Sequence, residues 1–411
     1  MTCRQHRLKP KPSLLAPLLL AFSMPHQALA ATSAATDAQL NAEQLNAEQS
    51  STKPSAEQVL LSSIRLPEGF EIEVLHSRFK NYRQMALTDS GWLYVGSRKE
   101  GKVFYLPLPG SEAEKRGIAG EINMKFTMPS GIAHKDGKLY IADVGNLYRV
   151  DMADSPGKAL PTLMFDKLPK DLHHGWKYLK FGPDGRLYIP IGAPCNICDA
   201  GSDYSKIISL DVNLDSANLD SPDLDMRDEA LGVRNSVGFD FHPTTGELWF
   251  TDNGRDMMGD DMPSDELNRL SKRGQHFGYP YIHQGDTPDP EFGAGKRIED
   301  YVRPEAKLGA HVAGLGMTFY TGKQFPQKYQ GGIFIAEHGS WNRSSKVGYR
   351  IRFASLDGNR VKSLETFADG WLQGENVTGR PADVMMLPDG SLLVSDDGYD
   401  RIYRIVYRPE N

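Results

Sequence analysis

The sequence predicts an all-β fold, a six-bladed β-propeller, because a strand–turn–strand unit recurs six times along the chain. The unit "LTDSGWLYVGSR" is echoed by "HKDGKLYIADVG", "GPDGRLYIPIG", "HPTTGELWFTDNG", a weaker "KYQGGIFIAEHG" and "LPDGSLLVSDDG". Asp89, Asp136 and Asp184 mark the first three turns and are 47 and 48 residues apart. Helical periodicity is almost absent from the repeats. Two stacked β-sandwiches are the alternative architecture.

Each unit consists of an apolar strand, a turn built on Asp-Gly or its equivalent, and a second apolar strand. Many units continue into a third strand resembling "YRI". The inner strands of a propeller converge on a central channel. We therefore expect residues at the start of successive inner strands, although distant in sequence, to meet at one mouth.

The two segments before the repeats are predicted to lie outside the fold. Residues 1–30 combine a basic start, the apolar run "LLAPLLLAF" and a final "ALA", which is the pattern of a cleaved signal peptide. The apolar run is short for a membrane span, and a retained anchor is the alternative. Residues 31–58 lack the apolar content to fold and read as a disordered linker. The propeller is assigned to 59–411, and the protein is expected in the periplasm.

The charge balance excludes two classes of partner. The formal net charge is −6, and removing the four basic residues of the leader, which has no acidic residue, leaves −10. A chain this acidic is poorly suited to a phosphate backbone or an anionic membrane surface. We expect no nucleic-acid partner and no membrane span after signal cleavage.

Two cysteines remain after the leader, Cys195 and Cys198 in "PCNICD". In an exported protein this pair is most simply a short disulfide. Covalent haem attachment would need a histidine after the second cysteine, where Asp199 stands. Zinc would need further ligands that the sequence does not cluster nearby.

Unusual polar residues stand just before several of the inner strands. His173 and His174 precede the third unit, Arg234 and Asn235 the fourth, and Arg380 the sixth. An unpaired buried arginine is costly, so several on an inward rim call for an anionic partner. Pairing of each arginine with a nearby acid is the alternative.

Several motifs of this sequence resemble those of a known protein family. The segment from about 62 to 408 resembles the soluble glucose/sorbosone dehydrogenases that depend on pyrroloquinoline quinone (PQQ), with the sorbosone branch nearest. The shared motifs are "HHGWKYLKFGPDGRLYIPIG", "LGVRNSVGFDFHP", "TDNGRD" with "SDELNRL", "GQHFGYPY" and "GRPADVMMLPDG". The resemblance implies an oxidoreductase that uses PQQ and Ca²⁺ to oxidise a sugar or sugar aldehyde and passes electrons to an external acceptor.

The resemblance implies that His174 is the catalytic base, which removes a proton from a sugar hydroxyl while hydride moves to the quinone. Histidine suits this role because its unperturbed pKa of about 6.5 lies near working pH. Adjacent side chains of an extended segment point to opposite faces, so only one of the two imidazoles is expected to face the channel. His173 stands where relatives carry an acid that orients the base. Two hydrogen-bonded turn histidines are the alternative.

The resemblance also implies the cofactor contacts. Arg234 and Asn235 match an Arg-Asn pair that lies over the cofactor in the family, and Arg234 is also expected to be a catalytic residue. Arg380 matches an arginine that binds the carboxylates of the cofactor. Arg343 and Lys346 are the remaining basic candidates.

The resemblance further places Ca²⁺ on the backbone carbonyls of Gly254 and Arg255, with Asn253 and Asp265 supporting the ion. Ca²⁺ would polarise the quinone oxygens as a Lewis acid. A solvated surface loop is the alternative for this segment. His311, at the entrance of the fifth blade, is a candidate contact to the substrate.

Two other classes of propeller remain open from the sequence. A Ca²⁺-dependent lactonase would hold calcium with inward side chains and would have no use for an arginine-lined carboxylate pocket. A non-catalytic carbohydrate- or protein-binding propeller would not need His174. The fold alone separates none of these.

Overall fold

The structure is a computed structural model and describes residues 54–212 and 224–409. The expected leader and the expected linker as far as residue 53 lie outside this described part. A compact unit begins at Ala56. Among the described residues, no helix is long and apolar enough to cross a bilayer.

The folded unit starts slightly earlier than the sequence predicts. Helix α2 (Ala56–Ser63) includes residues 56–58, which composition had assigned to the linker. The helix is held by tertiary packing, because Leu60 and the following Ile64 lie in an apolar cluster around Trp371.

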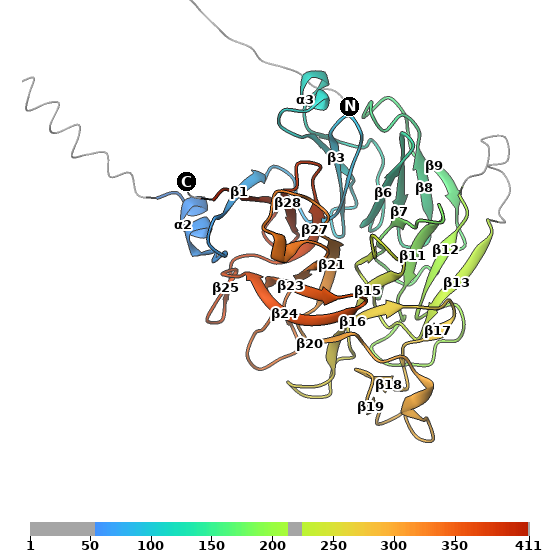
Figure 1. The fold of residues 1–411 in the computed structure, drawn as a ribbon. Coiled ribbons are helices and arrows are strands. Elements are labelled where there is room, and N and C mark those ends of the chain that lie inside the picture. Colours follow the sequence, from blue (N-terminus) through green and yellow to red (C-terminus); the bar gives the residue numbers. More distant parts are fainter. Residues whose placement is uncertain (1–53, 213–223, 410–411) are drawn as a thin grey trace, which may run out of the picture. The chain divides into compact units, whose positions relative to one another are not determined.

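Six sheets form the body of the fold, which confirms the predicted six-bladed propeller (Figure 1). Blade 1 contains β2 (Tyr82–Leu87), β3 (Trp92–Ser97), β4 (Phe104–Pro107) and β5 (Gly120–Glu121). Blade 2 contains β6 (Gly131–Lys135), β7 (Lys138–Ala142), β8 (Leu147–Val150) and β9 (Thr162–Phe165). Blade 3 contains β10 (Lys180–Phe181), β11 (Leu187–Ile191), β12 (Lys206–Leu210), β13 (Met226–Leu231) and β17 (Gln275–His276).

The remaining three blades follow the same order. Blade 4 contains β14 (Phe239–Phe241), β15 (Leu248–Asp252), β16 (Ser264–Leu270) and β20 (Ala306–Ala310). Blade 5 contains β21 (Gly314–Phe319), β22 (Ile333–Glu337), β23 (Arg350–Asp357) and β24 (Arg360–Ala368). Blade 6 contains β27 (Pro381–Met386), β28 (Leu392–Asp396), β29 (Arg401–Tyr407) and the early strand β1 (Phe70–His76).

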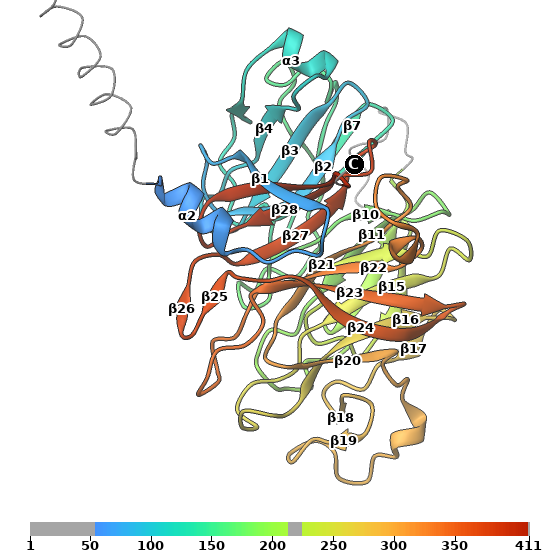
Figure 2. The ribbon, with the colours of Figure 1, turned by 60° about the vertical axis from the view of Figure 1, so that its left-hand side comes forward.

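Short elements connect or extend the blades: α3 (Glu112–Arg116), β18 (Ile282–His283), β19 (Thr287–Pro288), η2 (Ile298–Asp300), η3 (Gln327–Tyr329), β25 (Leu372–Gln373) and β26 (Asn376–Val377). The hairpin of β18 and β19 projects from the sheets at the periphery (Figure 2).

The ring is closed by the two ends of the folded unit. Strand β1 pairs antiparallel with β29, so Phe70 lies opposite Tyr407. The first strand of the chain thereby covers the outer edge of the last blade. This pairing satisfies backbone groups that an open edge would expose.

The recurrent Asp-Gly pairs form the expected hairpin turns. Asp136 and Gly137 join β6 to β7 with φ angles of 51° and 71°. Both values lie in the left-handed region that a two-residue type I′ turn needs, and Asp-Gly is among the pairs that adopt it most easily.

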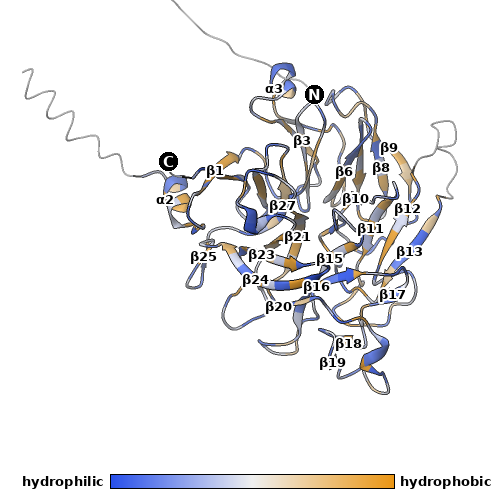
Figure 3. Ribbon diagram, viewed as in Figure 1, coloured by the Kyte–Doolittle hydropathy of each residue, from blue (hydrophilic) through white to orange (hydrophobic). Residues whose placement is uncertain are grey.

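The apolar core lies between neighbouring blades. One cluster packs Trp249 of blade 4 against Phe319 and Ile335 of blade 5. Figure 3 shows apolar segments along strands such as β1 and β9, interspersed with hydrophilic ones. Inner strands of neighbouring blades contact one another, as β21 and β27 do near the centre of Figure 1.

The strand directions decide where loops gather. In every blade the first and second strands are antiparallel. The start of the first strand and the end of the second therefore lie on one face of the propeller. The Asp-Gly turns lie on the other face.

Candidate active site

A central cavity of about 510 Å³ lies on the face where inner strands begin, and blades 1, 3, 4, 5 and 6 contribute to its lining. Its lining includes four arginines and four histidines: Arg83, Arg98, Arg234, Arg380, His173, His174, His311 and His338. Residues from five blades thus meet at one mouth, as the alignment of the repeats predicts. The concentration of arginine is local, because the whole chain is acidic.

His174 is fixed in one orientation at the cavity wall. Its side chain is buried, with 7% of the residue exposed, and Nδ1 lies 2.9 Å from the carbonyl oxygen of Ala193. A carbonyl only accepts, so Nδ1 carries the proton and Nε2 of the neutral ring keeps its lone pair. Burial, followed by the positive charge of Arg234, lowers the pKa of His174 to about 2. The ring is therefore an unprotonated acceptor at neutral pH.

The expectation that only one of the two imidazoles faces the channel is wrong. Both His173 and His174 line the cavity, and their ring centroids are 4.1 Å apart. The reason is local: His174 has a φ of 50°, so the segment turns instead of running extended. The backbone oxygen of Ala193, not His173, orients the ring of His174. Burial and Arg234 lower the pKa of His173 as well.

Gly192 shows why the end of β11 can approach this histidine. A Cβ added at Gly192 would lie 2.6 Å from the Cβ of His174 and 2.9 Å from its carbonyl oxygen. Any larger residue would displace the histidine backbone, so the motif "PIGAP" needs glycine at this position.

Arg234 is held firmly by protein groups. Its Nε donates to the carbonyl of Asn196 at 2.9 Å, and one terminal nitrogen donates to the Asn196 side-chain oxygen at 2.8 Å. The other terminal nitrogen donates to the Asn253 carbonyl at 3.1 Å. Asp256 lies 3.4 Å away. The guanidinium is thus positioned, with few donors left for a ligand, at the cavity wall.

Asp252 fixes the backbone of the Arg-Asn pair. The amides of Arg234 and Asn235 donate to its two carboxylate oxygens at 2.9 and 2.7 Å. Burial raises the pKa of Asp252 to about 6, although these hydrogen bonds oppose the shift. The side chain of Asn235 lines the cavity.

The two cysteines form a disulfide, and their loop supports the site. Asn196 lies between them in sequence and accepts two of the hydrogen bonds from Arg234, one at its backbone carbonyl and one at its side-chain oxygen. Its side-chain oxygen also accepts from the amide of Asp256 at 2.8 Å. The Tyr279 hydroxyl accepts from the amide of Cys198 at 3.0 Å. The disulfide loop therefore positions Arg234, a role that the sequence did not reveal.

The segment "DNG" after β15 carries features of a cation site. Among the described residues, nothing donates a hydrogen bond to the carbonyl oxygens of Gly254 and Arg255, whereas the flanking carbonyl of Asn253 accepts one and that of Asp256 accepts two. The side-chain oxygen of Asn253 is also buried without a partner among the described residues. Oxygens in this condition suit Ca²⁺.

Asp265 stands behind this segment. Its two carboxylate oxygens accept from the amides of Gly254 and Ala313, both at 2.7 Å. Burial raises the pKa of Asp265 to about 7. A nearby cation would stabilise the ionised form of this carboxyl group.

His311 lines the cavity on the side of blade 5. Its Nε2 lies 2.8 Å from the carbonyl oxygen of Gly259, and its Nδ1 lies 3.9 Å from the carboxylate of Asp256. His311 thus shares Asp256 with Arg234 and has a ring edge at the cavity.

A family profile described as Glucose / Sorbosone dehydrogenase matches residues 145–404, more than half of the chain. The chain belongs to this family. An uncharacterised protein of Borreliella burgdorferi is 32% identical over 370 residues, which cover 86% of this chain and 93% of that protein.

Two solved structures share the fold of this glucose/sorbosone dehydrogenase family member. A calcium structure of a carbohydrate-active enzyme of family AA12 from Trichoderma reesei has a TM-score of 0.68 at 19% identity and covers 84% of this chain and 97% of its own. The holo form of the PQQ domain of pyranose dehydrogenase from Coprinopsis cinerea has a TM-score of 0.66 at 17% identity, with the same coverage.

Two expected cofactor ligands of this family member lie outside the central cavity. Arg343 donates to the carbonyl of Asp260 and lies 3.1 Å from the carboxylate of Asp261. Lys346 donates to the carbonyl of Glu375 at 2.6 Å. Neither residue lines the cavity of His174, so the expectation that they contact the same group is not supported by their position. Both residues instead line a groove of about 660 Å³ next to the cavity.

Arg380 and Arg98 line the cavity without a carboxylate partner among the described residues. Arg380 lies 3.0 Å from the Tyr349 hydroxyl and 3.4 Å from Nδ1 of His338, and no described carboxylate forms an ion pair with it. Arg98 also has no ion-pair partner among the described residues and stacks 3.8 Å from the ring of Trp176. Burial and Arg83 lower the pKa of Arg98 to about 10. Both arginines therefore suit an anionic ligand.

Sequence reasoning missed Arg83, Arg98, Asn196 and His338. Arg98 and His338 both follow a second strand, at "GSR" and "EHG", which is the position of the cation segment "DNG" in blade 4. Extending the comparison of repeats to these positions would have found them. Arg83 stands at the start of the first inner strand, β2, so the rule for strand starts would have found it. Its salt bridge to Asp397, which also bonds His338 at 2.6 Å, was not predictable, because it joins residues more than 300 positions apart.

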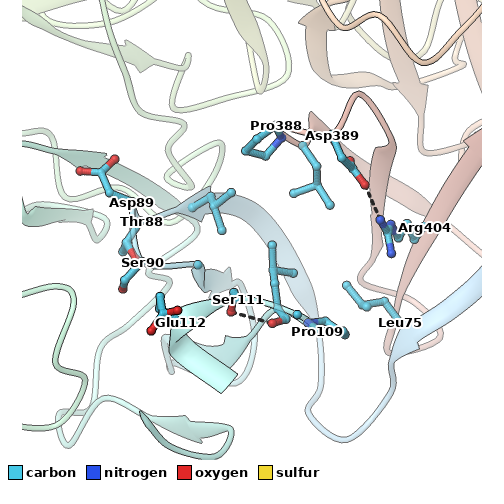
Figure 4. A pocket seen from close by; sticks show the side chains of 15 residues that line it. Leu75, Thr88, Asp89, Ser90, Pro109, Ser111, Glu112, Pro388, Asp389 and Arg404 are labelled. Atoms are coloured by element: carbon cyan, nitrogen blue, oxygen red, sulfur yellow. Dashed lines mark hydrogen bonds and ion pairs between the residues drawn. The ribbon is translucent and has the colours of Figure 1, made fainter. Parts of the chain in front are cut away.

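A second cavity, of about 610 Å³, lies on the opposite face between blades 1 and 6 (Figure 4). Four leucines and two prolines make much of its lining: Leu75, Leu87, Leu108, Leu387, Pro109 and Pro388. Its arginine, Arg404, is paired with Asp389. This cavity brings no histidine together with its charged groups and is not the candidate active site.

Proposed function

We propose that this protein is a PQQ-dependent dehydrogenase that oxidises a sugar or a sugar aldehyde. The observation that carries the proposal is one cavity that combines a neutral, oriented histidine with arginines lacking carboxylate partners. The family match and the likeness to a PQQ domain support the same assignment. The calcium structure of a relative of the same fold supports Ca²⁺.

We assign proton transfer, cofactor binding and Ca²⁺ binding to different residues of the cavity. Nε2 of His174 accepts the proton of the substrate hydroxyl, or of a hydrated aldehyde, as the C–H bond loses its hydride. Arg98 and Arg380 bind carboxylates of the cofactor, and Arg234 and Asn235 form the wall against its rings. PQQ, when bound, accepts the hydride and later yields two electrons to an external acceptor. The carbonyls of Gly254 and Arg255 would hold Ca²⁺, which would polarise the quinone oxygens.

The proposal is tested by adding PQQ and Ca²⁺ to the purified apoprotein and measuring cofactor binding and dye reduction. The substrate panel contains aldoses, sugar aldehydes and polyols. Replacing Arg98 or Arg380 by alanine is expected to weaken PQQ binding by about 10- to 100-fold, because a charge-assisted hydrogen bond contributes roughly 1.5–3 kcal/mol. Arg360→Ala is the control, since Arg360 is highly exposed and pairs with Glu305.

Two results would contradict the proposal. One is the absence of PQQ binding in the presence of Ca²⁺. The other is equal loss of affinity in the Arg360 control. Hydrolysis of lactones with Ca²⁺ alone would instead indicate a lactonase. Cell fractionation tests the further expectation that the signal peptide is cleaved and the protein reaches the periplasm.

A further inference from the structure

Trp341 is a highly exposed aromatic residue beside the candidate active site. It is 70% exposed and lines both the central cavity and a neighbouring groove of about 660 Å³. Arg380 also lines both. The groove is therefore continuous with the site at these two residues.

The loop that carries Trp341 is closed at its base. The amide of Ser340 donates to the carbonyl of Val347 at 3.0 Å, and the hydroxyl of Tyr349 donates to the carbonyl of Ser340 at 2.6 Å. Gly339, with a φ of 99°, packs so closely that an added Cβ would lie 2.4 Å from the Tyr349 ring. Trp341 follows directly from this closed base.

The loop is also tied to the blades on either side. Arg343 and the amide of Ser344 bond to Asp260 of blade 4, the second at 3.0 Å. Lys346 bonds to Glu375, in the hairpin between β25 and β26, at 2.6 Å. The basic residues expected at the cofactor therefore tether the loop. The exposure of Trp341 follows from a fixed loop and not from a loose one.

The other walls of the groove are polar. The β25–β26 hairpin contributes Glu375 and Asn376, and the loop after β28 contributes Tyr399. Arg343 and Lys346 of the Trp341 loop also line the groove, where each is held by the contacts described above. A carboxylate, an amide and a phenol can exchange hydrogen bonds with sugar hydroxyls. The indole of Trp341 offers an apolar face to the C–H groups of a sugar ring. Single exposed apolar residues are common, but this one stands fixed between a polar groove and the candidate active site.

We propose that the groove is a second sugar subsite and that the preferred substrate has at least two linked rings. The reacting ring enters the cavity of His174, and the next ring stacks on Trp341. This inference rests on the proposed function for the identity of the reacting ring. With PQQ bound, the cavity of about 510 Å³ would have less room for substrate, and the second ring would occupy the adjoining groove.

The test is a direct binding measurement with reduced PQQ and Ca²⁺ present, so that the cavity is filled and the sugar is not oxidised, and it is repeated without them. The purified protein is titrated by calorimetry with glucose, maltotriose, cellotriose and xylotriose. At least one trisaccharide is expected to bind about tenfold more tightly than the monosaccharide, a difference of ~1.4 kcal/mol. Trp341→Ala should remove that advantage and leave monosaccharide binding unchanged, while Trp341→Phe should keep most of it. Ile118→Ala, which alters a 79% exposed residue outside both cavities, is the matched control.

The outcomes separate this inference from the proposed function. Dye reduction with monosaccharides but no trisaccharide preference would leave the function standing and overturn the subsite. A trisaccharide advantage lost in Trp341→Ala, without PQQ binding, would support the subsite and overturn the function. If Trp341→Ala slowed only oxidation by a protein electron acceptor, the surface would bind that acceptor and the inference would be wrong.

Discussion

Replacing His174 by asparagine should remove the proposed proton acceptor, Nε2, and keep the hydrogen bond that Nδ1 makes. The residue has a φ of 50°, and asparagine adopts the left-handed region more readily than most residues do. The asparagine amide nitrogen can occupy the position of Nδ1 and donate to the carbonyl of Ala193. The acceptor at Nε2 of this cavity-lining residue is deleted. The variant therefore isolates the proposed base from its structural role.

The expected loss follows from that single atom. General base catalysis contributes roughly 10²- to 10⁴-fold in rate, so the turnover rate should fall by that factor. This corresponds to a rise of about 3–5 kcal/mol in the activation free energy. Stability should change little, because the hydrogen bond retained at Ala193 is itself worth only about 1 kcal/mol. The affinity for PQQ should remain close to that of the wild type, since the arginines are unchanged.

The assay follows PQQ reduction by substrate in a stopped-flow spectrometer after cofactor saturation, with affinity and melting temperature measured on the same samples. His173→Asn is the companion variant and should have a much smaller effect, because Ala193 and not His173 orients the ring. Turnover of His174→Asn within a factor of about ten of the wild type, with PQQ bound, would refute the assignment of the base.

Three further outcomes are expected. Asn196→Ala should weaken PQQ binding, because it removes the side-chain oxygen that holds one terminal nitrogen of Arg234 while the backbone bond to Nε remains, and equal affinity by fluorescence titration would show that Arg234 needs no such support. Removing Ca²⁺ with a chelator should abolish dye reduction and lower PQQ affinity, with recovery when Ca²⁺ but not Mg²⁺ is restored, because Mg²⁺ needs a stricter octahedral shell. Burial raises the pKa of Asp383 from 3.8 to about 7, so the folded state binds the extra proton and loses stability as pH rises through that range. Between about pH 5 and pH 8 the free energy of unfolding should fall by roughly 3 kcal/mol through this residue, and Asp383→Asn should remove this part of the slope in chemical denaturation, while Asp252 and Asp265 keep theirs.

The repeats made the fold predictable before any coordinates. Each Asp-Gly turn between two apolar strands is a local signal, since two left-handed residues are favourable at Asp136 and Gly137 whatever surrounds them. Counting these units was sufficient for six blades. Closure by β1 was not predictable in this way, because the pairing of Phe70 with Tyr407 joins opposite ends of the unit and has no local pattern.

The candidate site was partly predictable for the same reason. The positions before inner strands follow from the register of the repeat, so His174, Arg234 and Arg380 were found from the sequence. Side-chain direction was not: His173 lines the same cavity as His174 because of one positive φ angle. Arg343 and Lys346 stand near the site in sequence but point to neighbouring loops.

The sequence alone determined the architecture and the histidine and arginine residues at the strand starts, because each is encoded within a few neighbouring residues. Tertiary structure decided which groups meet. The contacts of Arg234 with Asn196, of Arg83 with Asp397, and of Trp341 with its groove depend on loops from different blades. Such contacts arise only when the ring closes, so no segment of the chain carries them by itself.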